Sequence, residues 1–173
     1  MKETINAFDY AEQIAKALPK GILLNTQNEK FNTMVIGWGH LGVIWGLPTF
    51  TVYVRQSRYT KPALDAAGEF TISVPFGENA ALTPEHLRAF GRLSGRDVNK
   101  EDYVNLEEPR TIRTPGIREY PLTLECRVLY RQDQVLAQIP QNVLDRYYAR
   151  GADDGDFHTA YIGQIVDAYI IRP

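Results

Sequence analysis

Short runs of β-branched and aromatic residues recur along the chain, and they limit the folds that are open to it. Turn residues such as glycine, proline and asparagine flank these runs, which is typical of β-strands. The strands predicted in this way span residues 22–26, 33–38, 49–54, 70–74, 122–130 and 159–171, with a weaker candidate at 134–139. Six or seven strands in 173 residues predict a single, mainly β domain over 1–173, built as a barrel or a sandwich with short helices.

Helices are predicted between these strands from capping and stop signals. Asn6 and Thr83 are placed to cap the first and third of them, and Gly68 is placed to end the second. The stretch 99–116 carries scattered charges and two prolines, so we expect a long excursion whose ordering depends on a ligand or a partner subunit. The predicted helices span residues 6–18, 62–68, 85–93 and 141–150.

Composition narrows the possible partners. The chain is 44% hydrophobic and 23% charged, as in soluble globular proteins, and its net charge of -2 argues against a nucleic-acid-binding surface. We expect a cytoplasmic protein, because no apolar run reaches the ~20 residues of a membrane span and the N-terminus lacks a signal-peptide pattern. The single Cys126 shares the apolar phase of its predicted strand, which favours a place in the core.

A cluster of cations and hydroxyls stands between a predicted strand and a predicted helix, in residues 55–61. Guanidinium groups can hold phosphate oxygens two at a time, and hydroxyls can fill the remaining acceptor sites. We expect Thr60 to cap the helix, whose first-turn amides would add to the field at an anion. The cluster therefore predicts a phosphate site, while a solvated charged loop remains the alternative. Its cationic and hydroxyl residues are Arg55, Ser57, Arg58, Tyr59, Thr60 and Lys61.

Other chemistries find little support in the sequence. The glycine spacing over 37–42 matches a dinucleotide fingerprint, but proline and β-branched residues follow where that fingerprint requires a helix. These glycines instead favour a tight hairpin or a close approach of backbone to a flat ligand. His40, His86 and His158 have no carboxylate or cysteine at ligand spacing, so we predict no metal site. Serine-nucleophile and nucleotide-cradling motifs are absent from the sequence.

Five segments follow one another in the chain: Asn32–Gly39, Val54–Thr60, Phe70–Pro75, Ser94–Lys100 and His158–Ala168. In this order they resemble the flavin reductase-like family, including its flavoredoxin-type members. The resemblance runs from about residue 21 to 171. It implies an FMN-binding split β-barrel of Greek-key type, assembled as a homodimer with FMN in a groove near the subunit interface.

The resemblance also assigns site residues. The strand at 32–37 is implied to line the flavin; the alternative is a barrel strand without this role. The turn at 55–60 is implied to hold the flavin phosphate. Lys100 is placed to reach the flavin or its phosphate, and His158 is placed as a catalytic residue near the nicotinamide or the flavin edge; the alternatives are an exposed lysine and a surface histidine. The cofactor-binding residues so implied are Asn32, Thr33, Met34, Val35, Ile36, Gly37, Arg55, Ser57, Arg58, Thr60 and Lys100.

Two positions depart from the family pattern. Val35 stands where many members have threonine, and Asn99 replaces a common aspartate. Neither change prevents flavin binding. Trp38 and Trp45 could cover the flavin ring or its entrance, although core positions are the more usual place for tryptophan.

Three functions remain open at this point. The leading hypothesis is an oxidoreductase that reduces FMN with NAD(P)H, since the flavin supplies the reactivity and the protein supplies position. The alternative is an FMN-binding electron carrier that is reduced by a redox protein partner. A barrel that binds another phosphorylated or planar ligand is the third.

Overall fold

The computed structural model describes residues 1–77, 81–148 and 156–172, and these contain ten strands and four α-helices. Eight strands form one sheet: β1 (Lys2–Thr4), β2 (Ile22–Gln27), β3 (Phe31–Ile36), β4 (Gly39–Ile44), β5 (Leu47–Arg55), β6 (Glu69–Val74), β9 (Leu122–Asp133) and β10 (His158–Ile171). The short strands β7 (Leu106–Glu107) and β8 (Gly116–Ile117) pair separately. The helices are α1 (Ala11–Ala17), α2 (Thr60–Ala67), α3 (Pro84–Gly91) and α4 (Gln141–Tyr147).

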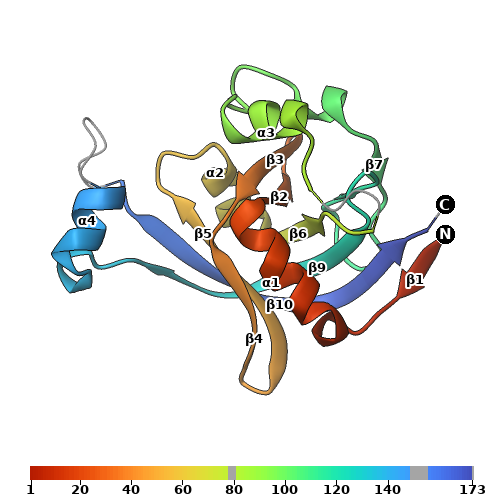
Figure 1. Ribbon diagram of the computed structural model, residues 1–173, viewed down its shortest axis with the longest axis horizontal. Coiled ribbons are helices and arrows are strands. Elements are labelled where there is room, and N and C mark those ends of the chain that lie inside the picture. Colours follow the sequence, from red (N-terminus) through yellow and green to blue (C-terminus); the bar gives the residue numbers. More distant parts are fainter. Residues whose placement is uncertain (78–80, 149–155, 173) are drawn as a thin grey trace.

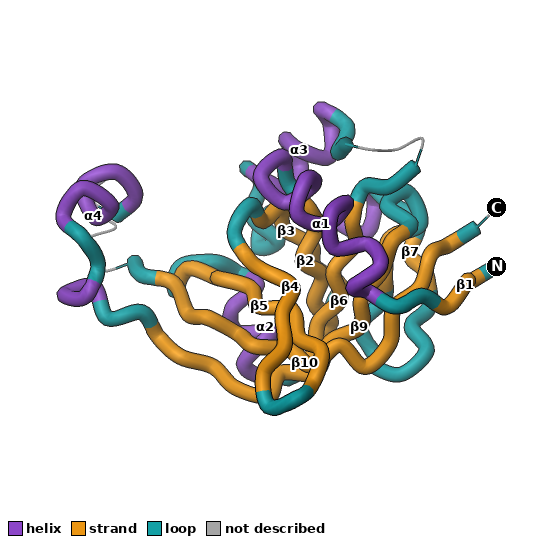
Figure 2. The backbone as a smooth tube through the Cα atoms, turned by 60° about the horizontal axis from the view of Figure 1, so that its bottom comes forward, coloured by secondary structure: helices purple, strands orange, loops and turns teal. Residues whose placement is uncertain are grey.

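The large sheet runs in the order β3-β2-β6-β9-β10-β5-β4, with β1 beside the end of β10, and its strands pair antiparallel. It curls around a core, as a split barrel does, while α1 lies across the opening and α4 projects at one end (Figures 1 and 2). The mainly β fold predicted from the sequence is confirmed. Side chains that alternate inward from six strands fill the core, including Leu24, Phe50, Phe70, Ile72, Leu124 and Tyr161.

Some predicted elements differ from the structure. The weak strand candidate at 134–139 is wrong: Leu136–Gln138 form a 3₁₀ turn instead. Thr60 does not cap α2, because the N-cap is Tyr59 and the Thr60 hydroxyl accepts a hydrogen bond from Asn32. The helix predicted over 141–150 is found over Gln141–Tyr147, and residues 149–150 lie outside the described part of the chain.

Strand β4 was not predicted, because its glycines are weak strand formers. A Cβ at Gly39 would lie 2.6 Å from the Thr51 carbonyl oxygen, so only glycine permits this approach of β4 to β5. The two strands form a hairpin whose turn residues, Trp45 and Gly46, have φ angles of 55° and 74°. Two positive φ angles are typical of a tight hairpin turn. Thus the glycine-rich segment forms the hairpin that the sequence suggested.

The excursion over 99–116 is held within the single chain. Glu125 of β9 is fully buried, and its carboxylate accepts hydrogen bonds from the Arg110 and Thr111 backbone N–H groups and from the Thr111 hydroxyl. Glu69 accepts a further bond from the Arg113 N–H. These carboxylates tie the excursion to β6 and β9.

Cys126 lies fully buried in the core, as predicted, and burial raises the pKa of its thiol. Among the described helices, none has the length and apolar character needed to cross a membrane. Over 1–77, 81–148 and 156–172, no three His, Cys, Asp or Glu side chains are grouped in a way that could hold a metal ion.

Candidate functional site

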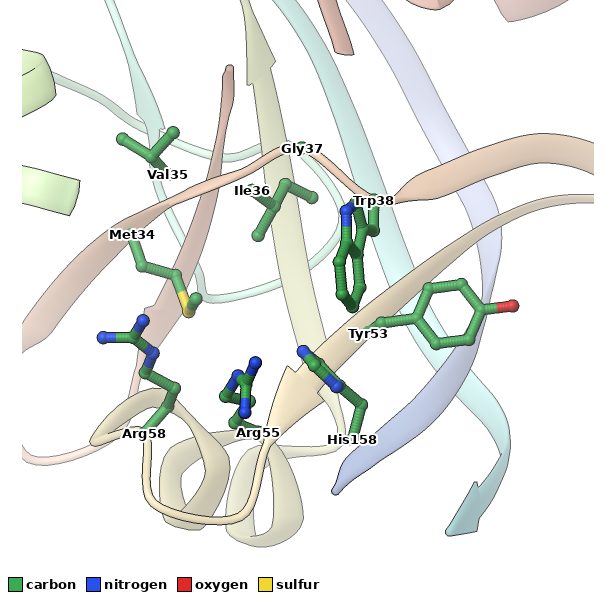
Figure 3. A pocket seen from close by; sticks show the side chains of 9 residues that line it. All are labelled: Met34, Val35, Ile36, Gly37, Trp38, Tyr53, Arg55, Arg58 and His158. Atoms are coloured by element: carbon green, nitrogen blue, oxygen red, sulfur yellow. The ribbon is translucent and has the colours of Figure 1, made fainter. Parts of the chain in front are cut away.

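A groove opens beside β3, formed by two hollows of about 160 Å³ each. They share Met34, Val35 and Arg58, so they lie side by side. The first hollow, shown in Figure 3, is lined by Met34, Val35, Ile36, Gly37, Trp38, Tyr53, Arg55, Arg58 and His158. The second is lined by Asn32, Met34, Val35, Ser57, Arg58, Tyr59, Thr60, Phe90, Gly91, Arg92, Leu93, Ser94, Gly95, Arg96 and Lys100.

Strand β3 supplies one wall of the groove and leaves polar capacity unused there. Asn32 is buried, and its Nδ2 donates to the Thr60 hydroxyl over 2.9 Å, but its Oδ1 has no hydrogen-bond partner among the described residues. The Thr33 hydroxyl is equally without a partner in that part of the chain. Thr33 lines neither hollow, although it was predicted to line the flavin. Because buried polar atoms are usually paired, the free oxygen of Asn32 favours a ligand that brings a donor.

Lys100 brings a buried positive charge to the second hollow. Lys100 is only 4% exposed, and its Nζ donates a hydrogen bond to the Thr33 carbonyl oxygen over 2.7 Å. Burial and the nearby charge of Arg58 lower the pKa of Lys100 to about 8. Among the described residues, no carboxylate forms an ion pair with Lys100 or Arg58. Two adjacent cations without a counter-ion form a site that favours an anion.

The predicted phosphate cluster divides between the hollows. Arg58 and Thr60 face the second hollow with Lys100, whereas Arg55 lines the first. The Arg55 guanidinium already donates to the Tyr147 and Asp156 carbonyls, over 2.7 and 3.2 Å. Figure 3 shows Arg55 between Arg58 and His158.

Ser57 lines the second hollow, but both of its donors are engaged. Its N–H and its hydroxyl donate to the two carboxylate oxygens of Asp156, over 2.9 and 2.8 Å. Asp156 was not identified from the sequence, because nothing in its local pattern indicates contact with a turn that lies about one hundred residues earlier in the chain. Arg58, Thr60 and Lys100 are therefore the members of the predicted set with capacity left for a phosphate.

His158 begins β10 and closes one side of the first hollow. It is 6% exposed, its ring lies 4.8 Å from that of Trp38, and its Nδ1 lies 2.9 Å from the Tyr148 hydroxyl. Burial, followed by the charge of Arg55, lowers the pKa of His158 to about 4. The imidazole is therefore neutral at pH 7. Trp38 is 39% exposed and lines the groove instead of the core, whereas Trp45 is 67% exposed at the tip of the β4–β5 hairpin.

The loop after α3 contributes contacts that the sequence indicated only as a polar segment. The cations of Lys30 and Arg96 both lie over the Tyr59 ring, at 5.4 and 5.5 Å from its centre. A Cβ at Gly95 would lie 2.3 Å from the Asn32 Oδ1, so the loop closes over Asn32 only with glycine there. Asn99, the second departure from the family pattern, donates to Asp102 and lines neither hollow.

Known proteins resemble this chain over most of its length. The family model described as flavin reductase like domain matches residues 16–173. An uncharacterized protein of Archaeoglobus fulgidus is 26% identical over 166 residues, which are 95% of this chain and 76% of that protein.

Two solved structures illustrate the shared fold. Flavoredoxin from Methanosarcina acetivorans has a TM-score of 0.64 and 23% identity, covering 88% of this chain and 69% of the other. The NADH:FAD oxidoreductase SgcE6 from Streptomyces globisporus has a TM-score of 0.62 and 16% identity, covering 88% of this chain and 75% of the other. Both likenesses support the split-barrel fold that was expected from the sequence.

Proposed function

Because this chain belongs to the flavin reductase-like family, we propose that it is an FMN-binding oxidoreductase whose flavin is reduced by NADH or NADPH. The observation that carries the proposal is the groove beside β3. Its second hollow holds the charges of Arg58 and Lys100, which have no ion-pair partner among the described residues, and its first hollow is bounded by Trp38 and His158. A ligand with an anionic end and a planar aromatic end matches this division.

The residues of the groove fit FMN. Arg58 and Thr60 are placed to hold the phosphate, with Lys100 as a second positive charge. The free Oδ1 of Asn32 can accept a hydrogen bond from the ribityl chain or the ring. When bound, the flavin supplies the redox chemistry, since its ring accepts a hydride and passes electrons on. Trp38 and Ile36 give the first hollow an apolar wall that orients the ring and limits its contact with water.

The NADH:FAD oxidoreductase with this fold supports nicotinamide as the electron donor. The excursion over 99–116, which would cover the flavin edge of an electron carrier, contributes only Lys100 to the groove and leaves the first hollow open beside His158. The flavoredoxin likeness supports the alternative, an FMN-binding electron carrier that is reduced by a protein partner.

An anaerobic visible spectrum separates these functions. We expect the FMN-loaded, desalted protein to be yellow and to bleach when NADPH or NADH is added. A yellow protein that keeps its colour with both nucleotides would support the electron carrier. A colourless protein after desalting would count against FMN as a bound cofactor.

The buried Lys100 makes FMN affinity depend on pH. A bound phosphate favours the protonated lysine, so binding raises the pKa of Lys100 above the value of about 8 in the free protein. We therefore expect full affinity below pH 8 and a fall above it, by at most about tenfold per pH unit. Fluorescence titrations of FMN at several pH values measure this. Lys100→Met should bind FMN more weakly, and its affinity should not change with pH in this range. If its affinity falls above pH 8 as in the wild-type protein, another group is responsible for the titration.

We also propose that the protein forms a homodimer with the groove near the interface. The exposed Trp45 and Val43 of the β4–β5 hairpin support this, because large apolar side chains at a protruding tip are typical of contact surfaces. Light scattering on the purified protein measures the mass, and a monomer at micromolar concentration would contradict the proposal.

A further inference from the structure

A chain of polar groups lies behind the imidazole of His158. Tyr148, directly after α4, places its hydroxyl 2.9 Å from Nδ1 of His158 and 2.8 Å from Oε1 of Gln134. The same Oε1 accepts a bond from the backbone N–H of His158 over 3.1 Å. Tyr148 is buried, so these contacts are shielded from water. Gln134 directly follows β9, Tyr148 directly follows α4 and His158 begins β10, and their side chains meet beside the first hollow.

The positions of the protons follow from this geometry. The backbone N–H of His158 can only donate, so it must face the oxygen of the Gln134 amide. That oxygen can only accept, so the contact with Tyr148 requires the tyrosine proton. A tyrosine hydroxyl has one proton, and its oxygen is therefore an acceptor toward Nδ1. Nδ1 must carry a hydrogen, and the neutral ring then has none on Nε2.

We infer that Gln134 and Tyr148 are positioning residues that hold His158 as its Nδ1–H tautomer, so that Nε2 accepts a hydrogen bond from the ligand in the first hollow. Nε2 has no hydrogen-bond partner among the described residues. The inference rests on the proposed function, in which the nicotinamide meets the flavin in this hollow. The amide group of a nicotinamide carries N–H donors that match such an acceptor.

The charges around the ring agree with this role. Arg55 and Arg58 disfavour a charged imidazole, and Asp156 opposes them. With burial as the largest effect, the pKa of His158 falls to about 4, so the ring is neutral through the physiological range. His158 therefore acts as an acceptor at pH 7 and carries no charge toward the ring of the flavin.

Nuclear magnetic resonance of ¹⁵N-histidine-labelled protein, without ligand at pH 7, tests the tautomer directly. We expect a protonated Nδ1 and an unprotonated Nε2 for His158, assigned by the loss of its signals in His158→Gln. In Gln134→Leu the tyrosine proton is released to donate to Nδ1, so the tautomer should switch to Nε2–H. Tyr148→Phe removes the hydroxyl that accepts from Nδ1, so His158 should no longer be held in the single Nδ1–H tautomer. Tyr130→Phe, at an exposed position of β9, is the matched control.

The acceptor role is measured with two nucleotides. In the acetylpyridine analogue of the oxidised nicotinamide nucleotide, a methyl group replaces the amide nitrogen while the carbonyl is kept. We expect the FMN-loaded protein to bind the natural nucleotide about tenfold more tightly than this analogue, which is the loss of one hydrogen bond. Gln134→Leu should bind the two equally.

The outcomes separate the inference from the proposed function. An Nε2–H tautomer in the wild-type protein, or an unchanged tautomer in Gln134→Leu, overturns the inference even if NADH bleaches the flavin. Equal binding of the two nucleotides by the wild-type protein overturns the acceptor role. If neither nucleotide binds, the protein does not use a nicotinamide donor, and Nε2 of His158 has no nicotinamide amide to accept from. Both proposals then fail, whichever tautomer is found.

Discussion

Arg58→Ala is expected to weaken FMN binding by about tenfold to a hundredfold, while riboflavin binding changes little. Riboflavin lacks the phosphate, and a hydrogen bond to a charged group contributes about 1.5–3 kcal/mol. Arg58 lines both hollows and has no carboxylate partner among the described residues, so its charge is available to the ligand. Arg58 itself is exposed, and its loss leaves the buried Lys100 as a cation of the second hollow. Fluorescence titration with both flavins gives the two dissociation constants.

Two other arginines serve as controls for this experiment. Arg88→Ala removes an exposed cation from α3 that lines neither hollow, and it should affect neither flavin. Arg55→Ala should discriminate less between FMN and riboflavin than Arg58→Ala does, because Arg55 is held by Tyr147 and Asp156. If Arg58→Ala weakens both flavins equally, the phosphate lies elsewhere.

Glu125→Ala is expected to lower the free energy of unfolding by about 3–5 kcal/mol, because three hydrogen-bond donors lose their acceptor at a cost of about 1–3 kcal/mol for each one that stays buried. The carboxylate is fully buried and receives three hydrogen bonds from Arg110 and Thr111. Alanine leaves these donors without an acceptor and leaves a cavity beside β9. The excursion over 99–116 should loosen first, since this carboxylate is one of the groups that join it to the sheet.

Thermal unfolding monitored by circular dichroism measures this loss. For a chain of this size, 3 kcal/mol corresponds to a fall in Tm of roughly 10 °C. Glu29→Ala is the control, because Glu29 is an exposed carboxylate between β2 and β3. A Tm for Glu125→Ala equal to that of Glu29→Ala would show that the three hydrogen bonds contribute nothing net to folding.

Local sequence signals were sufficient for most of the fold. Strands such as β6 and β9 are rich in β-branched and apolar residues, and Thr83 caps α3 as its position predicts. β4 was missed because its glycines serve the contact of Gly39 with Thr51, a tertiary constraint that no propensity records. The segment 134–139 has strand-like residues, but Gln134 instead turns its side chain to Tyr148 and His158.

The site shows the same limit more clearly. The cationic turn could be located because charge and hydroxyls stand together in the sequence. The division of this turn between the two hollows could not be predicted. Arg55 and Ser57 donate hydrogen bonds to Tyr147 and Asp156, which lie about one hundred residues away along the chain. The depressed pKa of Lys100 likewise depends on burial against β3, which only the folded chain provides.

The first and last strands of the sheet place both ends of the described chain at one pole. The Met1 amino group donates to the Arg172 carbonyl over 2.9 Å, and β1 pairs with the final residues of β10 (Figure 1). His158 stands at the opposite end of this 14-residue strand, roughly 40 Å away at the usual rise of a β-strand. A tether to an electrode or a sensor surface, attached at either end, would thus lie at the end of the sheet farthest from His158.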